Sequence, residues 1–197
     1  MRSRKKTFPA LKKVTENSRL LEVNINKAYL DLNRLIKESR KLKDSLSEMT
    51  LMERKCRYFY SKNQIDSLVI ASEQLQKVSG DYSNEYYEAM ADVYLAETYS
   101  VNKLYNKAIL HLNNAYNTLL KDKSESKKIF YAKANVLSSF ANVYMGKNEP
   151  ENAVRKLREE IRSGSEIKNK NKFASFQYHN YANISNAYTQ IFQRRNS

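Results

Sequence analysis

The sequence contains very little glycine and proline. Only three glycines and two prolines occur in 197 residues, and none of them lies between Ala10 and Ser79. β-Sandwiches and β-barrels need glycine- and proline-rich turns at short intervals, so this scarcity argues against both and predicts an all-α chain. The glycines are also too far apart to form the glycine-rich loops that hold nucleotide phosphates.

Cysteine and histidine are equally scarce. Cys56 is the only cysteine and cannot form an internal disulfide, and with His111 and His179 it cannot form a structural zinc cluster. We therefore expect no metal and no cofactor, and we expect a reducing compartment, the cytoplasm. No apolar run approaches the roughly 20 residues that a membrane span needs. The basic first residues lead into polar sequence and not into an apolar segment, so export is not expected.

Positive charge is concentrated at the two ends of the chain. The net charge is +14, with 16 basic and 7 acidic side chains in residues 1–60 and a basic excess again after residue 125. Lysine and arginine near phosphates bind nucleic acid without sequence preference, which makes nucleic-acid binding the alternative function. The basic side chains that would carry it are Arg2, Arg4, Lys5, Lys6, Lys168, Lys170 and Lys172. A solvated helix surface explains the same charge more simply.

A pattern of small and aromatic residues recurs at intervals of 40 to 45 residues. In each case a small residue precedes an aromatic by three positions, and in three units another apolar or small residue follows nine positions later. The pairs are Cys56 and Phe59, Ala96 and Tyr99, Ala141 and Tyr144, and Ser185 and Tyr188, with Leu68, Ala108 and Ala153 as the later positions.

This pattern resembles the tetratricopeptide repeat (TPR) family over about residues 49–192. The clearest unit reads Ala96, Tyr99, Lys103, Tyr105 and Ala108 at the family's characteristic positions. The period is longer than the family's usual 34 residues, as in bacterial TPR sensor and scaffold domains. The resemblance implies an α-solenoid of antiparallel helical hairpins whose concave face binds a protein or peptide.

Polar breaks divide the chain into the expected elements. We expect helices at about 12–44, 50–61, 64–78, 84–101, 104–121, 126–146, 150–163 and 172–193. Residues 1–48 form a basic segment with a long capping or coiled-coil helix, and repeats follow at about 49–82, 83–124, 125–168 and, incomplete, 169–197. Gly80 is expected to end one helix in the left-handed conformation, Pro150 to begin another, and Ser45 and Thr50 to begin capping boxes.

A heptad pattern marks the first long helix. Apolar and small residues alternate at spacings of three and four, at Leu21, Ile25, Ala28, Leu32, Leu35, Ser39, Leu42 and Leu46. Such a seam serves a dimeric coiled coil or packs on the first hairpin as a cap, and the cap is favoured. The last expected helix also has an apolar face (Phe176, Tyr181, Ile184, Tyr188 and Ile191) with no following helix to cover it. Self-association through either surface is therefore open.

The family resemblance implies which side chains face a ligand. By register in the first helix of each repeat they are Arg57, Tyr60, Met90, Val93, Glu97, Asn135, Ser138, Asn142, His179 and Asn186. Asn142 and Asn186 share one repeat position, where an asparagine in relatives often holds a peptide backbone. The lysine that chaperone-binding relatives need is absent from its position.

No residue pattern favours catalysis. His111 and His179 stand on separate helices with no nucleophile or carboxylate fixed beside either. Cys56 occupies a packing position, which predicts an inert buried thiol. The pair Glu159–Glu160 lies in a charged helix and is expected to face solvent. The best hypothesis is a non-enzymatic protein- or peptide-binding scaffold or sensor domain.

Overall fold

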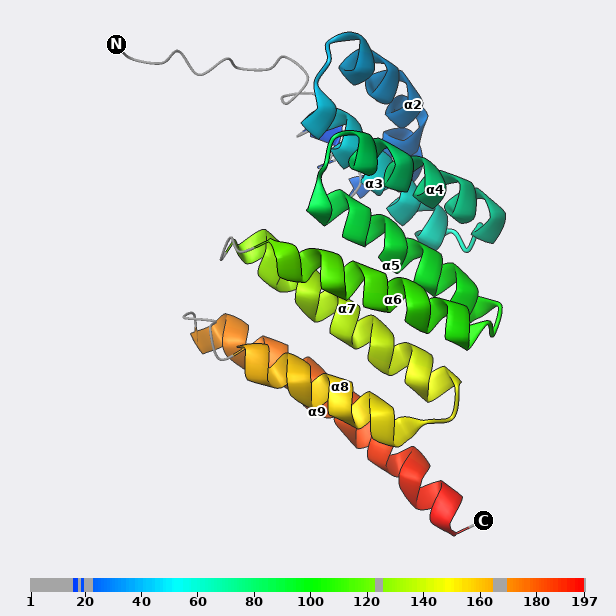
Figure 1. Cartoon of the computed structure of the whole chain (residues 1–197), viewed down its shortest axis with the longest axis vertical. Coiled ribbons are helices and arrows are strands. Elements are labelled where there is room, and N and C mark those ends of the chain that lie inside the picture. The colour runs from blue at the N-terminus through cyan, green and yellow to red at the C-terminus, as the bar shows by residue number, and fades with distance from the viewer. Residues whose placement is uncertain (1–15, 18, 20–22, 123–125, 165–169, 197) are drawn as a thin grey trace. The chain divides into compact units, whose positions relative to one another are not determined.

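The computed structural model describes residues 16–17, 19, 23–122, 126–164 and 170–196. Within these ranges the chain is all-α: it forms eight helices and no strand, and successive helices pack against each other as in a helical repeat (Figure 1). The helices are α2 (Ile25–Lys41), α3 (Ser45–Ser61), α4 (Ile65–Asp81), α5 (Glu85–Val101), α6 (Tyr105–Lys121), α7 (Lys127–Gly146), α8 (Pro150–Ser163) and α9 (Lys170–Arg195). None of these described helices is long and apolar enough to cross a membrane.

The helices from α2 to α6 have the same length: each contains 17 residues. They begin at residues 25, 45, 65, 85 and 105, so one helix and its following turn occupy 20 residues. The interval of about 40 residues between the first aromatic anchors is therefore two such units. The later anchors are more widely spaced because α7 has 20 residues and because α6 and α7, and α8 and α9, are separated by more than the three residues between the earlier helices.

The same turn joins these helices. Lys43, Asn63, Ser83 and Lys103 each have a positive φ of 50° to 59°, and the next residue donates its backbone N–H to a carbonyl five positions earlier. This is the hydrogen-bond arrangement in which a left-handed residue closes a helix. The expectation for Gly80 was wrong: Gly80 lies within α4 and Ser83 is the left-handed residue.

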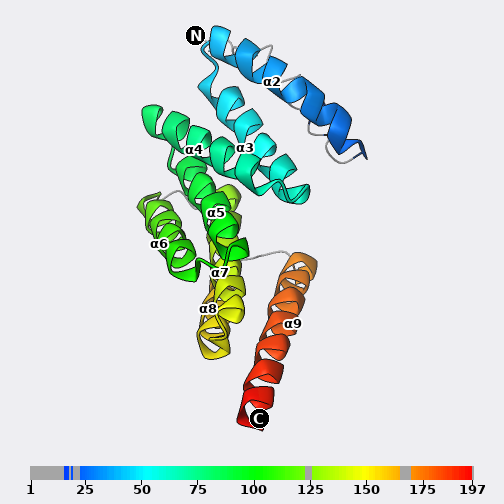
Figure 2. The ribbon, with the colours of Figure 1, turned by 90° about the vertical axis from the view of Figure 1, so that its right-hand side faces the viewer.

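The chain divides into two compact units, with the division inside α5 between Tyr94 and Leu95. In the first unit α2, α3 and α4 pack in succession (Figure 2). Cys56 of α3 is fully buried, and its sulfur lies 3.9 Å from the Ser72 hydroxyl oxygen of α4. Small side chains at this crossing let the helices approach closely, as the repeat pattern predicts.

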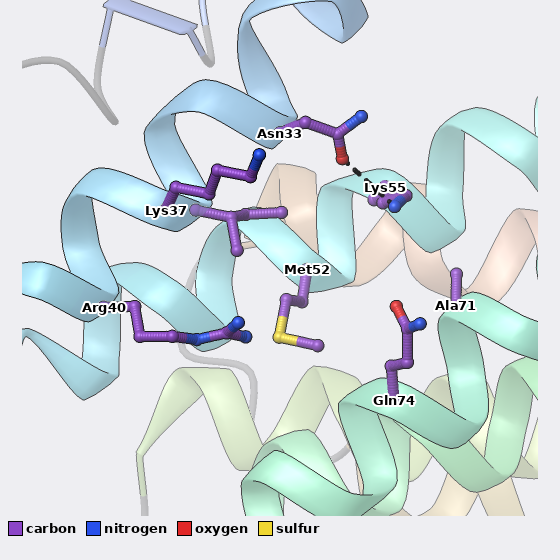
Figure 3. Close-up of a pocket in the computed structure, with 8 residues that line it drawn as sticks. Asn33, Lys37, Arg40, Met52, Lys55, Ala71 and Gln74 are labelled. Carbon is purple, nitrogen blue, oxygen red and sulfur yellow. Dashed lines mark hydrogen bonds between the residues drawn. The ribbon is translucent and has the colours of Figure 1, made fainter.

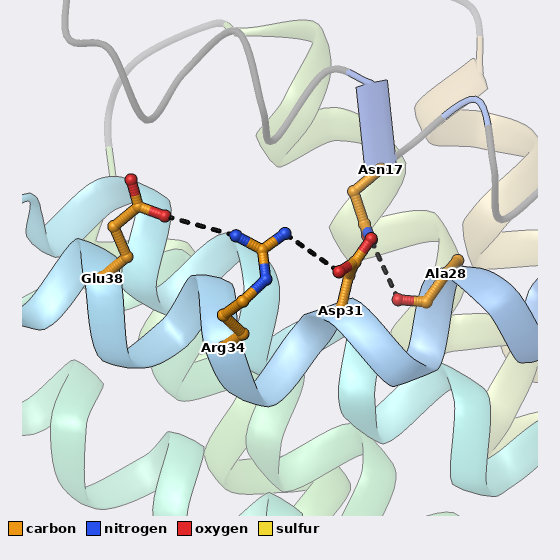
Figure 4. A network of polar contacts seen from close by, with 5 residues as sticks. All are labelled: Asn17, Ala28, Asp31, Arg34 and Glu38. Atoms are coloured by element: carbon orange, nitrogen blue, oxygen red, sulfur yellow. Dashed lines mark hydrogen bonds and ion pairs between the residues drawn. The ribbon is translucent and has the colours of Figure 1, made fainter.

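The N-terminal helix is shorter than expected, because the helix predicted over 12–44 is interrupted at Asn24. The Asn24 side chain accepts a hydrogen bond from the Lys27 backbone N–H at 3.0 Å and so begins α2 as an N-cap. Asn17, which is buried, donates to the Ala28 carbonyl at 2.9 Å and ties the preceding segment to α2 (Figure 4).

The described heptad positions of α2 are already filled by this chain. Ala28, Leu32, Leu35 and Ser39 are buried in the first unit, where α2 packs on α3. The capping interpretation of the heptad pattern fits this packing, since a dimer seam at the same residues would have to open it. On the outer side of α2, Arg34 pairs with Asp31 at 2.9 Å and with Glu38 at 3.8 Å (Figure 4).

The two expected capping boxes do not form. Asp44 caps α3 and accepts from the Ser47 backbone N–H at 3.1 Å, one residue before the predicted Ser45. Thr50 lies inside α3, where its hydroxyl donates to the Leu46 carbonyl and shares a hydrogen bond with the Tyr87 hydroxyl of α5. Aspartate is among the preferred N-cap residues, and Asp44 satisfies the Ser47 N–H at the start of α3.

In the second unit α6, α7, α8 and α9 pack in succession. Ala141, Ala153, Leu157 and Ile184 form a buried apolar cluster that joins α7, α8 and α9. Pro150 begins α8, as predicted, because the first turn of a helix needs no proline N–H.

The repeat register describes α3, α5 and α7 but not α9. Cys56, Ala96 and Ala141 are buried at the small position, whereas Ser185 is exposed and Ile184 and Ala187 are buried in its place. Of the predicted apolar face, Tyr181 and Tyr188 are exposed, and Phe176 and Ile191 are partly buried.

Candidate functional site

A pocket of about 270 Å³ lies among α7, α8 and α9 in the second unit. We call it the Glu160 pocket. Its lining comes from Tyr131, Ala134, Asn135 and Ser138 of α7, Glu160 of α8, and Phe176, Asn180 and Asn183 of α9. Six of these eight side chains carry a polar group, and Glu160 is the only charged one among them.

Glu160 presents a buried carboxylate with neutral partners. Its side chain is only 4% exposed; Oε2 accepts a hydrogen bond from the Ser138 hydroxyl at 2.7 Å, and Oε1 accepts from Asn180 Nδ2 at 3.2 Å. Burial raises the pKa of this carboxyl, and the two hydrogen bonds oppose the rise. The charge of an ionised Glu160 is therefore only partly compensated.

The side-chain oxygen of Asn180 accepts no hydrogen bond from the described residues. The residue is 2% exposed, and Nδ2 donates both to Glu160 and to the Phe176 carbonyl at 3.1 Å. Both partners are acceptors, which fixes the orientation of the amide and points Oδ1 elsewhere. Among the described residues Oδ1 has no hydrogen-bond partner, although buried polar atoms almost always have one.

Aromatic rings form part of the wall. Tyr131 and Phe176 line the pocket, and the Phe176 ring lies 6.0 Å from that of Phe130. Phe176 approaches the backbone at Gly164 so closely that an added Cβ would lie 2.4 Å from Cε1 of the ring. A glycine at position 164 is thus required for this ring position.

Two of the ten residues predicted to face a ligand line this pocket, Asn135 and Ser138. Asn142 is exposed four residues after Ser138 on α7, and Asn186 is exposed three residues after Asn183 on α9. These spacings place each asparagine on the same helix face as a pocket residue. The side chain of His179 lies outside the described ones.

The remaining predicted residues are not in this pocket. Arg57 and Tyr60 are exposed on α3, where Arg57 pairs with Glu53 at 3.3 Å. Glu97 is partly buried and accepts a hydrogen bond from the Ser139 hydroxyl at 2.8 Å, and burial raises the pKa of its carboxyl. It therefore braces α5 against α7.

Met90 and Val93 cannot contact a ligand. They are 6% and 3% exposed, which corrects their sequence-based assignment to the ligand-facing set. Every residue of α5 from Ala89 to Ala96 is buried. The assignment from repeat register assumes that each helix has one solvent-exposed face. A helix that is buried on all sides has no such face.

A second pocket, of about 330 Å³, lies among α2, α3 and α4 in the first unit (Figure 3). We call it the α2–α4 pocket. Lys37, Arg40 and Lys55 make it basic. Arg40 pairs with Glu48 at 2.7 Å, and Lys55 donates to the Asn33 side-chain carbonyl at 3.1 Å. Lys37 and Arg40 are exposed, so water can hydrogen-bond to their charged groups. The pocket therefore contains no buried charge that a ligand would have to neutralise.

The sequence prediction missed Glu160, Asn180 and Asn183. Glu160 was expected to face solvent with its neighbour Glu159, but only Glu159 is partly exposed and receives hydrogen bonds from Tyr116 and Lys156. Helix spacing carried the missed signal: Ala153, Leu157 and Glu160 stand at i, i+4 and i+7, the spacing of one buried face.

Cys56, the single cysteine of the chain, is buried in α3. Burial raises the pKa of the Cys56 thiol to about 12, which leaves the reactive thiolate unformed at neutral pH. No group of three metal-ligating side chains occurs among the described residues.

Neither a scan against protein-family models nor a search of curated proteins found a match.

Proposed function

We propose that this protein is a non-enzymatic scaffold or sensor that binds a peptide or protein segment along α7 and α9, in the manner of TPR domains. The Glu160 pocket is the observation that carries the proposal. It combines residues predicted to face a ligand with a buried polar group that has no hydrogen-bond partner in the described part of the chain, and exposed asparagines lie beyond it on α7 and α9. An asparagine amide can both donate to and accept from a peptide backbone.

A selection from a random peptide library displayed on phage, with the full chain as bait, tests the proposal. Binding of a selected peptide is then measured for the wild type and for the double variant Asn142→Ala and Asn186→Ala. Two lost hydrogen bonds of about 0.5 to 1.5 kcal/mol each predict a loss of roughly 5- to 150-fold in affinity. Alanine favours helices more than asparagine, so this variant keeps its fold.

The matched control is the double variant Asn113→Ala and Asn117→Ala. Both asparagines are exposed on α6, away from the pocket, and the substitutions are identical. Affinity equal to that of the wild type is expected. Equal loss in both double variants, or no peptide enriched over an empty support, would remove the basis for the proposal.

Nucleic-acid binding stays a prediction of the sequence alone, because none of the basic side chains named for it is described. Its signature is a steep fall in affinity with salt concentration, whereas peptide binding through amides responds weakly. A titration with a DNA oligonucleotide at two salt concentrations distinguishes the two.

A further inference from the structure

We propose that the Glu160 pocket receives a cationic side chain, a lysine or an arginine, of the bound polypeptide. This inference rests on the function proposed above and specifies what the ligand must carry. It follows from the acceptors of the residues that line the pocket, from a buried charge with no counter-ion among the described side chains, and from the aromatic rings beside it.

Residues that line the pocket have acceptors with unused hydrogen-bonding capacity. Asn180 Oδ1 has no hydrogen-bond partner in the described part of the chain, and its own amide nitrogen is already engaged. The two oxygens of Glu160 each accept one hydrogen bond, and a carboxylate has lone pairs for more. An ammonium group has three donors and no acceptor, which complements this set.

Charge selects a cation over a neutral donor. Ser138 and Asn180, the hydrogen-bond partners of Glu160, are both neutral. A buried charge is costly when no opposite charge is near, and a cation that enters the pocket removes that cost while it binds. Lys156 of α8 does not supply the cation, because it pairs with Glu159 at 3.1 Å, on the side of Tyr116.

Size and walls suit a side chain better than a single water molecule. The pocket's 270 Å³ far exceeds the roughly 10–15 Å³ that one water needs. Tyr131 and Phe176 line it, and aromatic rings attract cations through their π faces. The aliphatic part of a lysine or arginine packs on the same rings.

The test is an NMR titration of the ¹⁵N-labelled full chain with Nα-acetyl-lysine methylamide. The neutral isostere Nα-acetyl-norleucine methylamide has the same aliphatic length without the charge. We expect saturable shifts of the side-chain amide signals of Asn180 and Asn183 with the lysine compound. With norleucine we expect at least tenfold weaker binding or none. Equal binding of the two compounds would overturn the inference, and this comparison needs no variant.

Glu160→Gln and the matched Glu151→Gln sharpen the result. Glutamine preserves the size of Glu160 but removes its charge, so we expect at least a tenfold loss of affinity for the lysine compound. Glu151 lies on the same helix, exposed and paired with Arg194 at 3.4 Å, and its substitution should change nothing. A Glu160→Gln protein that is folded and binds lysine as the wild type does contradicts the proposal.

The peptides selected from the library separate this inference from the proposed function. If they bind along α7 and α9 but tolerate alanine at every lysine and arginine, the proposed function stands and the cationic anchor is wrong. If no peptide is selected but the lysine compound is held, the pocket chemistry stands and the proposed function fails.

Discussion

The segment from Ile25 to Lys121 and the segment from Lys127 to Arg195 differ in the regularity of their helices and in the charges that line their pockets. In the first, helices of one length alternate with one kind of turn, and the pocket beside them is lined by exposed cations that water satisfies. In the second, the helices contain 20, 14 and 26 residues, and they surround a buried carboxylate. Both segments bury carboxylates but compensate them differently: Glu48, 2% exposed, pairs with Arg40 at 2.7 Å, whereas the hydrogen-bond partners of Glu160 are neutral.

The largest change in the free energy of unfolding is expected when the buried carboxylate of the Glu160 pocket is removed. Glu160→Ala removes the acceptor for Ser138 and Asn180 and leaves a larger cavity, so the free energy of unfolding should fall by about 1 to 3 kcal/mol. Lys37→Ala in the α2–α4 pocket should change it by less than about 0.5 kcal/mol, because the side chain is exposed. Urea denaturation measures both. Equal effects would erase the contrast between the pockets.

Two glycines provide the next comparison. In Gly164→Ala the new Cβ must displace the Phe176 ring, and we expect a loss of about 1 to 2 kcal/mol together with weaker binding in the Glu160 pocket. Gly80→Ala meets nothing within 4 Å inside α4 and should stabilise the chain by about 0.5 to 1 kcal/mol. Thermal unfolding of the two variants should therefore move in opposite directions.

The pH dependence of stability tests the buried charge itself. Because burial raises the pKa of Glu160, the folded state keeps a proton that the unfolded state has already released. The stability of the wild type relative to Glu160→Gln is greatest below the unfolded pKa, near 4.3, and falls as pH rises through the folded pKa.

Each unit of pKa elevation corresponds to about 1.4 kcal/mol lost above that range. Glu97 has the same sign and is present in both proteins, so the difference between them isolates Glu160. Urea denaturation across pH 3 to 8 provides the data. A difference that is constant with pH, or that grows in favour of the wild type, would contradict the burial argument.

The smallest effects concern the regular turns. Ser83→Gly places glycine at a φ of 50°, where other residues are strained, and should add about 0.5 to 1 kcal/mol to the free energy of unfolding. Lys77→Gly, on the exposed side of the preceding helix, should subtract about 1 kcal/mol. If Ser83→Gly also destabilises, the left-handed turn is not the strained element of the repeat.

Much of the helix pattern was readable from the sequence. The expected boundaries of α5, α6, α7 and α8 lie within one residue of those observed, because polar breaks and Pro150 mark them. The turns were harder to predict. Lysine, serine and asparagine fill the left-handed positions where glycine is the usual sign, so nothing in residue type announced the 20-residue period.

The candidate site was predicted in part. Register placed Asn135 and Ser138 on the ligand-facing side, and they do line a pocket. It also placed Met90 and Val93 there, although both are buried. A register counts positions within one helix and cannot tell how many neighbours surround that helix.

By itself the sequence determined the all-α class and the positions of most helices, because glycine scarcity, apolar spacing and helix ends are local properties of the chain. Tertiary structure alone decided that α8 turns Glu160 inward while Glu159 stays at the surface, and that Asn180 of α9 meets it there. Burial and hydrogen-bond partners depend on residues that are distant in sequence, and the chemistry of the pocket arises from those distant contacts.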